Sequence, residues 1–297
     1  LMSEFLGFGY YAEIPAVIFN IQRCGPSTGM PTRNQQADLT LCAYASHGDT
    51  KHLLLFPKDP EECFYFSVAA FDLADQYQTP VLVVSDIDIG MNDWMVDKLS
   101  WDDAWQPDRG KVLGAEGLDR MDAFYRFLDT DGDHIPYRTL PGEHPKGSYF
   151  LRGSGHDKYG AYTEDSGKYQ EVVDRLRAKW QSAATAVPAP VIARAATHTR
   201  QAIIAIGSSD GAVREARARL EAEGTHLNYM RIRGFPFSRE VEEFIAEHDE
   251  VFVVEQNRDA QLHSLLTVET SAPKEKLTPI LHYAGEPLNY QFVFDAL

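Results

Sequence analysis

An apolar run that ends in a rigid, polar loop constrains the fold of this chain more than any other feature. Residues 16–21 (AVIFNI) are too few for a helix and rich in Val and Ile, so they are predicted to form a strand. The next residues, Arg23 to Arg33, contain two glycines and two prolines, which restrict the backbone. Asn34 is then expected to cap a helix that runs to about Ala45.

The chemistry of this loop suits an anion. In parallel α/β sheets, ligands bind beyond the carboxyl ends of the strands, which is where the loop is expected to lie. Arg23, Ser27, Thr28, Thr32 and Arg33 offer hydrogen-bond donors, and an arginine fork can bind a carboxylate through two parallel bonds. From the residues alone, an equal alternative is that Arg23 forms a salt bridge that holds the loop, while the hydroxyls satisfy turn amides.

Strands and helices alternate after the loop. His52–Pro57 and Val81–Ser85 are predicted to be strands, and the helix between them begins with Asp59 as its cap, a proline in its first turn and two acidic residues. This alternation predicts a parallel sheet with right-handed crossovers. Met2–Tyr11 reads as the end of a helix that follows an absent strand, and Leu1 is not a natural start. We therefore expect the sequence to lack earlier elements of its first domain.

Two changes of pattern divide the rest of the chain. Residues 86–167 are rich in Asp, Gly, Trp and Tyr, and they are too long for a passive connection. They are expected to form an extended arm over the sheet or against a partner chain. A helix at about 168–181 is predicted to complete the first domain, residues 1–181. Residues 182–198 are the predicted linker, and residues 199–297 are the predicted second domain.

The second domain repeats the alternation and is expected to be small and doubly wound. Gly207-Ser208-Ser209 follows its first strand, and a plain strand-to-helix turn is favoured there over a phosphate site because Asp210 would repel an anion. Residues 255–259 follow another strand, and we expect them to lie at a domain or subunit interface. Its other elements are predicted as strands at 202–206, 227–232, 251–255 and 279–282 and helices at 210–224, 239–247 and 259–267.

Composition excludes several classes of partner and site. A net charge of −16 over 297 residues argues against nucleic acid and against an anionic membrane surface. No run approaches the roughly 18 apolar residues of a transmembrane helix. Cys24, Cys42 and Cys63 are widely spaced and form no C-x-x-C pair, so neither a disulfide framework nor a zinc or iron–sulfur site is indicated. A reducing cytoplasm fits this pattern best.

Two weaker motifs are assigned structural roles. Residues 129–133 (DTDGD) begin like a calcium loop, but an EF-hand requires glycine and glutamate where this chain has His134 and Leu140. A structural turn is therefore favoured over calcium. His144 and His156 lie in the arm, where a solvent-exposed or interfacial position is favoured over catalysis. No pair of histidines has the i, i+4 spacing of a helical metal site, so no metal residue is assigned.

Four sequence blocks together resemble a known family. Residues 20–39 (NIQRCGPSTGMPTRNQQADL) resemble the signature of the α subunit of 2-oxoacid:ferredoxin oxidoreductases, particularly the 2-oxoglutarate branch. The likeness continues, in the family's order, through residues 131–142 (DGDHIPYRTLPG), 153–165 (GSGHDKYGAYTED) and 253–262 (VVEQNRDAQL). The block around Arg23 is highly specific, and the blocks cover nearly the whole chain.

The resemblance implies a fold, an activity and partners. It implies an α/β fold in which a partial pyrimidine-type domain of thiamine enzymes precedes a domain like the C-terminal domain of transketolase. The activity would be oxidative decarboxylation of a 2-oxoacid, expected to be 2-oxoglutarate, with coenzyme A as co-substrate and ferredoxin as electron acceptor. Thiamine diphosphate, its Mg²⁺ and a [4Fe–4S] cluster are expected mainly in a partner β subunit, so this chain would be inactive alone.

The resemblance also assigns site residues. The family's substrate-carboxylate arginine and a nearby threonine correspond to Arg23 and Thr32, with Ser27 and Thr28 as further candidates. No residue of this chain is assigned to catalysis or to cofactor binding. Cys24 departs from the family, which usually has glycine there, and this change would tighten the loop or place a thiol beside the substrate.

Other departures keep alternatives open. The family's Y-P-I-T-P-type segment is absent, as are the glutamate expected to activate the thiamine aminopyrimidine and any fused γ-type domain. One alternative is a non-catalytic assembly or regulatory partner of a thiamine-dependent enzyme. A pyruvate-specific relative is another. A different thiamine-dependent enzyme, such as a ketolase, is the weakest because the block around Arg23 is not its hallmark.

Overall fold

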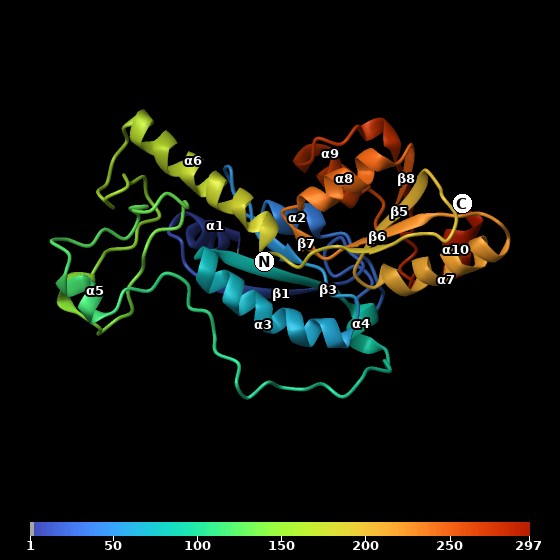
Figure 1. The fold of residues 1–297 in the computed structure, drawn as a ribbon, viewed down its shortest axis with the longest axis horizontal. Coiled ribbons are helices and arrows are strands. Elements are labelled where there is room, and N and C mark those ends of the chain that lie inside the picture. The colour runs from blue at the N-terminus through green and yellow to red at the C-terminus, as the bar shows by residue number, and fades with distance from the viewer. Residues whose placement is uncertain (1–2) are drawn as a thin grey trace.

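Two β-sheets form the framework of the chain (Figure 1). The computed structural model describes residues 3–297. The first sheet contains β1 (Ala16–Gln22), β2 (Leu53–Leu55), β3 (Pro80–Asp86) and β7 (Gly234–Phe235), in the order β1-β3-β2-β7. The second contains β4 (Val191–Ala193), β5 (Gln201–Ile206), β6 (Asn228–Ile232), β8 (Glu250–Glu255) and β9 (Leu277–Leu281), in the order β4-β6-β5-β8-β9.

The α-helices lie along the sheets, except α5, which lies in the arm (Figure 1). They are α1 (Ser3–Tyr11), α2 (Leu39–Ala43), α3 (Pro60–Tyr77), α4 (Ile87–Met91), α5 (Ala115–Asp119), α6 (Ser166–Ser182), α7 (Ser209–Ala222), α8 (Arg239–Glu247), α9 (Gln261–Glu269) and α10 (Tyr290–Asp295). The helix predicted at Met2–Tyr11 is therefore present from Ser3, and Met2 lies outside the described residues. Among the helices of residues 3–297, none combines the length and the apolar composition that crossing a lipid bilayer requires.

The first sheet has the predicted parallel core. β1 pairs with β3 along its whole length, from Ala16 opposite Pro80 to Gln22 opposite Asp86, and β2 pairs with β3 in parallel. β1 and β3 therefore end at the same edge of the sheet, from which residues 23–33 continue. β7 was not predicted, because two residues from the second half of the chain give no periodic signal; they pair antiparallel with β2.

The two helices of this region differ in how well the sequence predicted them. α3 begins as predicted, since the Asp59 carboxylate accepts a hydrogen bond of 2.8 Å from the Glu62 amide. The sequence predicted that Asn34 caps α2, the helix before α3. This prediction is wrong, because α2 begins only at Leu39. The Asn34 side chain donates instead to the Gln256 amide oxygen at 2.7 Å, which places this segment against the second sheet.

The second sheet is parallel except at one edge. β6, β5, β8 and β9 run in the same direction, as the predicted strand–helix alternation requires, while β4 pairs antiparallel with β6. α7 and α10 pack on one face around Val213, Leu220 and Val293. α8 and α9 cover the other face, which is continuous with the core of the first sheet.

The segment predicted as a linker contributes to the shared core. Ala183 and Val187 are buried in the cluster that also contains Leu82 of β3 and Ile204 of β5, and Val191 to Ala193 form β4. This part of the predicted linker, residues 182–198, is therefore packed against both sheets, because apolar side chains gain free energy from burial. The domain boundaries at 181 and 199 remain predictions.

The predicted arm, residues 86–167, contains only short helices. Figure 1 shows its first part as an open loop that passes α3 before it reaches α5. Its later part returns to α3, where the Arg138 guanidinium donates to the Asp75 carboxylate at 2.8 Å. His156 is fully buried against the Phe127 ring, so the prediction of an exposed or interfacial histidine is wrong for this residue. Its ring fills an aromatic cluster that also contains Tyr11, and burial lowers the pKa of this imidazole.

A buried ionic cluster joins the arm and α6 to the start of β1. Glu13 has no exposed surface, and its carboxylate accepts bonds of 2.6 and 2.9 Å from Arg175 and 2.7 Å from Lys179. Arg126 of the arm donates to the Glu13 carbonyl at 2.7 Å. Burial alone would raise the pKa of the Glu13 carboxyl, but the charges of Lys179 and Arg175 outweigh it and hold this pKa well below its usual value.

Glu13→Gln is expected to lower the free energy of unfolding by about 3–5 kcal/mol, because it leaves two buried cations without a countercharge. The Glu13 carboxylate stabilises the fold above the pKa of an unfolded glutamate, about 4.5, and this contribution is lost as the pH falls toward the lower folded pKa. Urea unfolding between about pH 3 and 7 should therefore show a shallower acid slope in the variant.

Glu171→Gln is the matched control, because Glu171 pairs with Lys158 on the surface. Its unfolding curves should stay close to those of the wild type at every pH. Equal curves for the Glu13 and Glu171 variants would contradict a stabilising role for the buried cluster.

Candidate functional site

Residues 23–33, called here the 23–33 loop, leave the carboxyl end of β1 and close on themselves. The Cys24 amide donates to the Arg33 carbonyl at 2.8 Å, which joins the two ends of the loop. Within it, the Met30 amide donates to the Cys24 carbonyl and the Arg33 amide to the Met30 carbonyl, both at 3.0 Å. The loop thus lies where the sequence predicted it, as a backbone-bonded hairpin rather than an open segment.

Two glycines allow the loop to close and to pack. Gly29 has a positive φ of 49°, and a Cβ there would lie 2.1 Å from the Cys24 carbonyl oxygen. Gly285, in the segment after β9, also has a positive φ, and a Cβ there would lie 2.5 Å from the Met30 side chain. The Gly285 carbonyl accepts the Asn34 amide at 3.0 Å, so the second sheet supports the end of the loop.

The Cys24 side chain belongs to this packing. It is only 5% exposed, and its sulfur would lie 3.5 Å from a Cβ at position 285. The thiol therefore faces the supporting turn rather than the open side of the loop. Of the two roles expected for Cys24, the tighter loop fits this position, since a thiol beside a substrate would have to reach the open side.

The predicted substrate residues are all exposed to solvent. Arg23, Ser27, Thr28 and Thr32 are exposed on one short loop, together with Arg33. Within residues 3–297, the side chains of these five residues form no hydrogen bond and no ion pair. The alternative in which Arg23 holds the loop through a salt bridge thus has no acidic partner in the described part of the chain. Likewise, the hydroxyls of Ser27, Thr28 and Thr32 accept no bond from a turn amide in this part of the chain.

A buried polar network lies beneath the loop and was missed by the sequence reasoning. Asp86, at the end of β3, accepts bonds from Gln36 at 2.8 Å and from Ser208 at 2.6 Å. Gln256, after β8, donates to Ser208 at 3.0 Å and accepts the Asn34 side chain at 2.7 Å. These five side chains are all nearly inaccessible to solvent.

The network connects the carboxyl ends of strands from both sheets. Gly207–Ser209 was assigned to a plain turn, but Ser208 and Ser209 both accept bonds from Gln256. The prediction that residues 255–259 lie at an interface agrees with these contacts, because Asn257 also donates to the Gln36 carbonyl at 3.1 Å. Alternating polar and apolar residues do not reveal such a network, since its members are up to 222 residues apart.

Two buried carboxyls at this edge, Asp86 and Glu255, are engaged by the chain itself. Burial raises the pKa of Asp86, and its oxygens accept Gln36, Ser208 and the Ile89 amide. Burial also raises the pKa of Glu255, whose oxygens accept the amides of Leu262 and His263. Neither carboxyl is available to hold a metal ion or a cofactor without loss of these bonds.

The other predicted motifs lie away from the loop. Asp129, Asp131 and Asp133 bring one carboxylate oxygen each within 4.8 Å of the others, but the Lys111 ammonium binds Asp131 and Asp133 at 2.5 Å each. Asp129 accepts the amides of Gly132 and His134. A cation of the chain thus pairs with two of the three carboxylates. The structural turn, favoured over calcium, stays a prediction.

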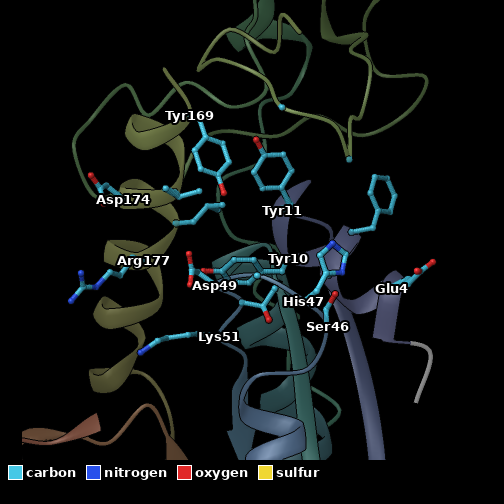
Figure 2. Close-up of a pocket in the computed structure, with 18 residues that line it drawn as sticks. Glu4, Tyr10, Tyr11, Ser46, His47, Asp49, Lys51, Tyr169, Asp174 and Arg177 are labelled. Carbon is cyan, nitrogen blue, oxygen red and sulfur yellow. The ribbon is translucent and has the colours of Figure 1, made fainter. Parts of the chain in front are cut away.

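A cavity of about 790 Å³ lies elsewhere, between α1, residues 46–51 and α6 (Figure 2). Tyr10, Tyr11 and Tyr169 line it, and Lys51 at its edge is bound by Glu269 at 2.6 Å. Because residues 46–51 precede β2 and α1 precedes β1, this cavity lies toward the amino ends of the strands. It contains none of the predicted site residues, so the 23–33 loop remains the candidate site.

Comparison with known proteins agrees with the sequence blocks. Residues 1–96 match the family described as pyruvate flavodoxin/ferredoxin oxidoreductase, thiamine diphosphate-binding. The chain is 31% identical over 296 residues to the α subunit of 2-oxoacid:ferredoxin oxidoreductase 2 from Aeropyrum pernix. This alignment covers 98% of this chain and 44% of that protein. The resemblance to this α subunit is confirmed.

Two further relatives carry names that include a substrate. The 2-oxoglutarate synthase subunit KorA from Methanothermobacter thermautotrophicus is 28% identical over 285 residues, which cover 94% of this chain and 72% of that subunit. The solved 2-oxoglutarate:ferredoxin oxidoreductase from Magnetococcus marinus, with 2-oxoglutarate, coenzyme A and succinyl-CoA bound, is 26% identical with a TM-score of 0.81. That alignment covers 99% of this chain and 50% of the solved chain.

These matches also confirm the predicted fold class. The first 96 residues match a thiamine diphosphate-binding family, and both sheets together superpose on the Magnetococcus enzyme. This chain spans about half the length of the Aeropyrum and Magnetococcus relatives.

Gly29→Ala is expected to open the 23–33 loop, because the new Cβ would clash with the Cys24 carbonyl that closes it. Trypsin should then cleave after Arg23 and Arg33 markedly faster than in the wild type, as followed by mass spectrometry. Gly132→Ala is the matched control, because Gly132 also has a positive φ but open space around its Cβ position. Equal cleavage of the loop in both variants would contradict the proposed steric role of Gly29.

Asp86→Ala and Ser208→Ala are expected to be energetically coupled, because their side chains share a buried hydrogen bond of 2.6 Å. A double-mutant cycle in urea unfolding should give a coupling energy of about 1–3 kcal/mol. Asp86→Ala combined with Thr267→Ala is the control pair, since Thr267 bonds only within α9, and its effects should add to within about 0.5 kcal/mol. Additive effects for the first pair would show that the network does not join the two sheets.

Proposed function

We propose that this chain is the substrate-positioning part of the α subunit of a 2-oxoacid:ferredoxin oxidoreductase that acts on 2-oxoglutarate. One observation carries the proposal: Arg23 lies on a closed, well-supported loop, exposed and without an ion-pair partner within residues 3–297. The relatives named for 2-oxoglutarate, from Methanothermobacter and Magnetococcus, support the choice of substrate.

The loop suits the substrate for a simple reason. A 2-oxoacid presents a planar carboxylate beside its ketone, and the planar guanidinium of Arg23 can bind that carboxylate through two parallel hydrogen bonds. Thr32, with Ser27 or Thr28, would add hydroxyl donors to the same group. A carboxylate held in this way fixes the direction of the adjacent ketone, and such orientation accounts for a large part of many enzymatic rate enhancements.

The remaining groups are assigned to other polypeptides. Asp86 and Glu255, two buried carboxyls beneath the loop, are engaged within the chain, so these residues do not fit Mg²⁺ or the aminopyrimidine of thiamine diphosphate. We therefore assign thiamine diphosphate, Mg²⁺ and a [4Fe–4S] cluster mainly to a β subunit, which would pass electrons to ferredoxin. Coenzyme A would be the acyl acceptor, the enzyme would be cytoplasmic, and this chain would be inactive alone.

Arg23→Ala, tested in the complete enzyme with its β subunit, is expected to lower kcat/KM for 2-oxoglutarate roughly 10- to 100-fold, because it removes a charge-assisted bond worth about 1.5–3 kcal/mol. The measurement is reduction of ferredoxin or a viologen dye in the presence of coenzyme A and thiamine diphosphate. Arg239→Ala is the control, because Arg239 is an exposed arginine of α8 that pairs only with Glu243, and it should leave turnover unchanged.

Two results would contradict the proposal in different ways. If the wild-type enzyme oxidises no 2-oxoacid, this chain is an assembly or regulatory partner rather than a catalytic subunit. If it does oxidise 2-oxoglutarate and Arg23→Ala behaves like Arg239→Ala, the carboxylate is bound elsewhere.

A further inference from the structure

The cavity between α1, residues 46–51 and α6 is lined by aromatic side chains from two helices. Tyr10 and Tyr11 come from α1 and Tyr169 from α6, and Phe8 of α1 adds a fourth ring. Figure 2 shows the rings of the three tyrosines around one space. The volume of about 790 Å³ lies within the range of about 300–1,000 Å³ that is typical of sites for small organic ligands.

Packing holds two of these rings in place before any ligand binds. Tyr10 is only 7% exposed and packs with Leu176 of α6. Its ring meets the buried His52 ring edge-on, with 5.8 Å between the ring centroids. Tyr11 packs against the ring of His156 at 4.7 Å. A wall that is fixed in this way lowers the entropy cost of binding a ligand.

A carboxylate lies beside the rings. Asp49 is close to Tyr10 in Figure 2, and it is exposed and forms no ion pair within residues 3–297. Burial raises the pKa of the Tyr10 hydroxyl, and the charges of Glu13 and Asp49 raise it further. The negative charge of Asp49 therefore acts on the wall of the cavity. Glu4 and His47 also line the cavity.

The cationic side chains around the cavity are directed elsewhere. Lys51 extends away from the rings in Figure 2, and Glu269 binds its ammonium at 2.6 Å. Arg177 and Asp174 carry opposite charges, and both point away from the tyrosine rings (Figure 2). The interior next to the rings thus offers a negative charge and aromatic faces, which disfavours an anionic ligand.

An organic ammonium ion matches this combination. The face of a tyrosine ring attracts a cation that lies within about 6 Å of the ring centre. The Asp49 carboxylate adds Coulomb attraction to the same charge. The methyl or methylene groups that surround such a nitrogen also bury apolar surface against the rings.

We propose that this cavity is a second binding site, which binds a small organic ammonium ion through the rings of Tyr10, Tyr11 and Tyr169 and the carboxylate of Asp49. The site is separate from the 23–33 loop and does not rest on the proposed function. A ligand held between α1 and α6 joins two helices that are far apart in the sequence, so its binding should also stabilise the fold. The lysine side chain of a partner protein carries the same charge, and the experiment distinguishes the two.

Choline is the probe, and 3,3-dimethyl-1-butanol, which has a similar shape without the charge, is the control ligand. Isothermal titration calorimetry of the chain should show saturable binding of choline and at least roughly 10-fold weaker binding of the neutral alcohol. Asp49→Asn should weaken choline binding roughly 5- to 10-fold and leave binding of the alcohol unchanged, because it removes only the charge.

Tyr169 provides a separate test of the rings, since it is 49% exposed and its replacement leaves the core intact. Tyr169→Leu should weaken choline binding roughly 2- to 5-fold, whereas Tyr169→Phe, which keeps the ring, should bind like the wild type. Tyr159→Leu is the matched control, because Tyr159 is 51% exposed in the arm and does not line the cavity. It should leave choline binding unchanged.

Several outcomes would overturn the inference. Absence of saturable choline binding, or equal binding of the alcohol, would show that the cavity does not select a cation. Equal losses in Tyr169→Leu and Tyr159→Leu, or wild-type affinity in Asp49→Asn, would place choline elsewhere on the surface. Binding to the chain that disappears in the complete enzyme with its β subunit would assign the cavity to a side chain of a partner protein. Urea unfolding at the wild-type midpoint checks that each variant is folded.

Discussion

The hydrogen bond between Ser208 and Asp86 joins the carboxyl ends of the two sheets, and the position of the 23–33 loop depends on it. Asp86 ends the strand beside β1, and Gln36 links it to the segment that leaves the loop. Gln256 links the same segment to the second sheet. Because each of these groups is buried, moving one sheet against the other would leave several polar atoms unpaired, at a cost of about 1–3 kcal/mol for each. The two sheets therefore hold one relative position at this edge.

This constraint explains why an exposed loop can still be well defined. Long arginine side chains are mobile, and ordering them on binding costs free energy. The chain reduces that cost by fixing the backbone through closure between Cys24 and Arg33 and through contact with the Gly285 turn. Only the outer parts of the side chains remain to be ordered by a ligand. The glycines thus serve close packing.

The sequence predicted the local elements well and the long-range contacts poorly. β3 and the start of α3 follow from a run of apolar residues and from a cap at Asp59, which are local signals. The start of α2 was misplaced because Asn34 has a cap's chemistry, yet its side chain binds Gln256 far along the chain. The burial of Val187 and His156 likewise depends on what the fold packs against them. The location of the loop was predictable, but the network that supports it was not.

Because Arg23 is exposed, water would weaken its binding to a carboxylate. A fully hydrated guanidinium binds a carboxylate with a net free energy of only about 0–1 kcal/mol, too little to select one acid in a cell. Selective binding requires that water be excluded from the ion pair, which strengthens both its charge interaction and its hydrogen bonds. Within residues 3–297, the open side of the loop has no protein surface that would exclude water from it. A site built on this loop is therefore complete only when another protein surface covers it, and the same surface would bring the reacting cofactor to the ketone.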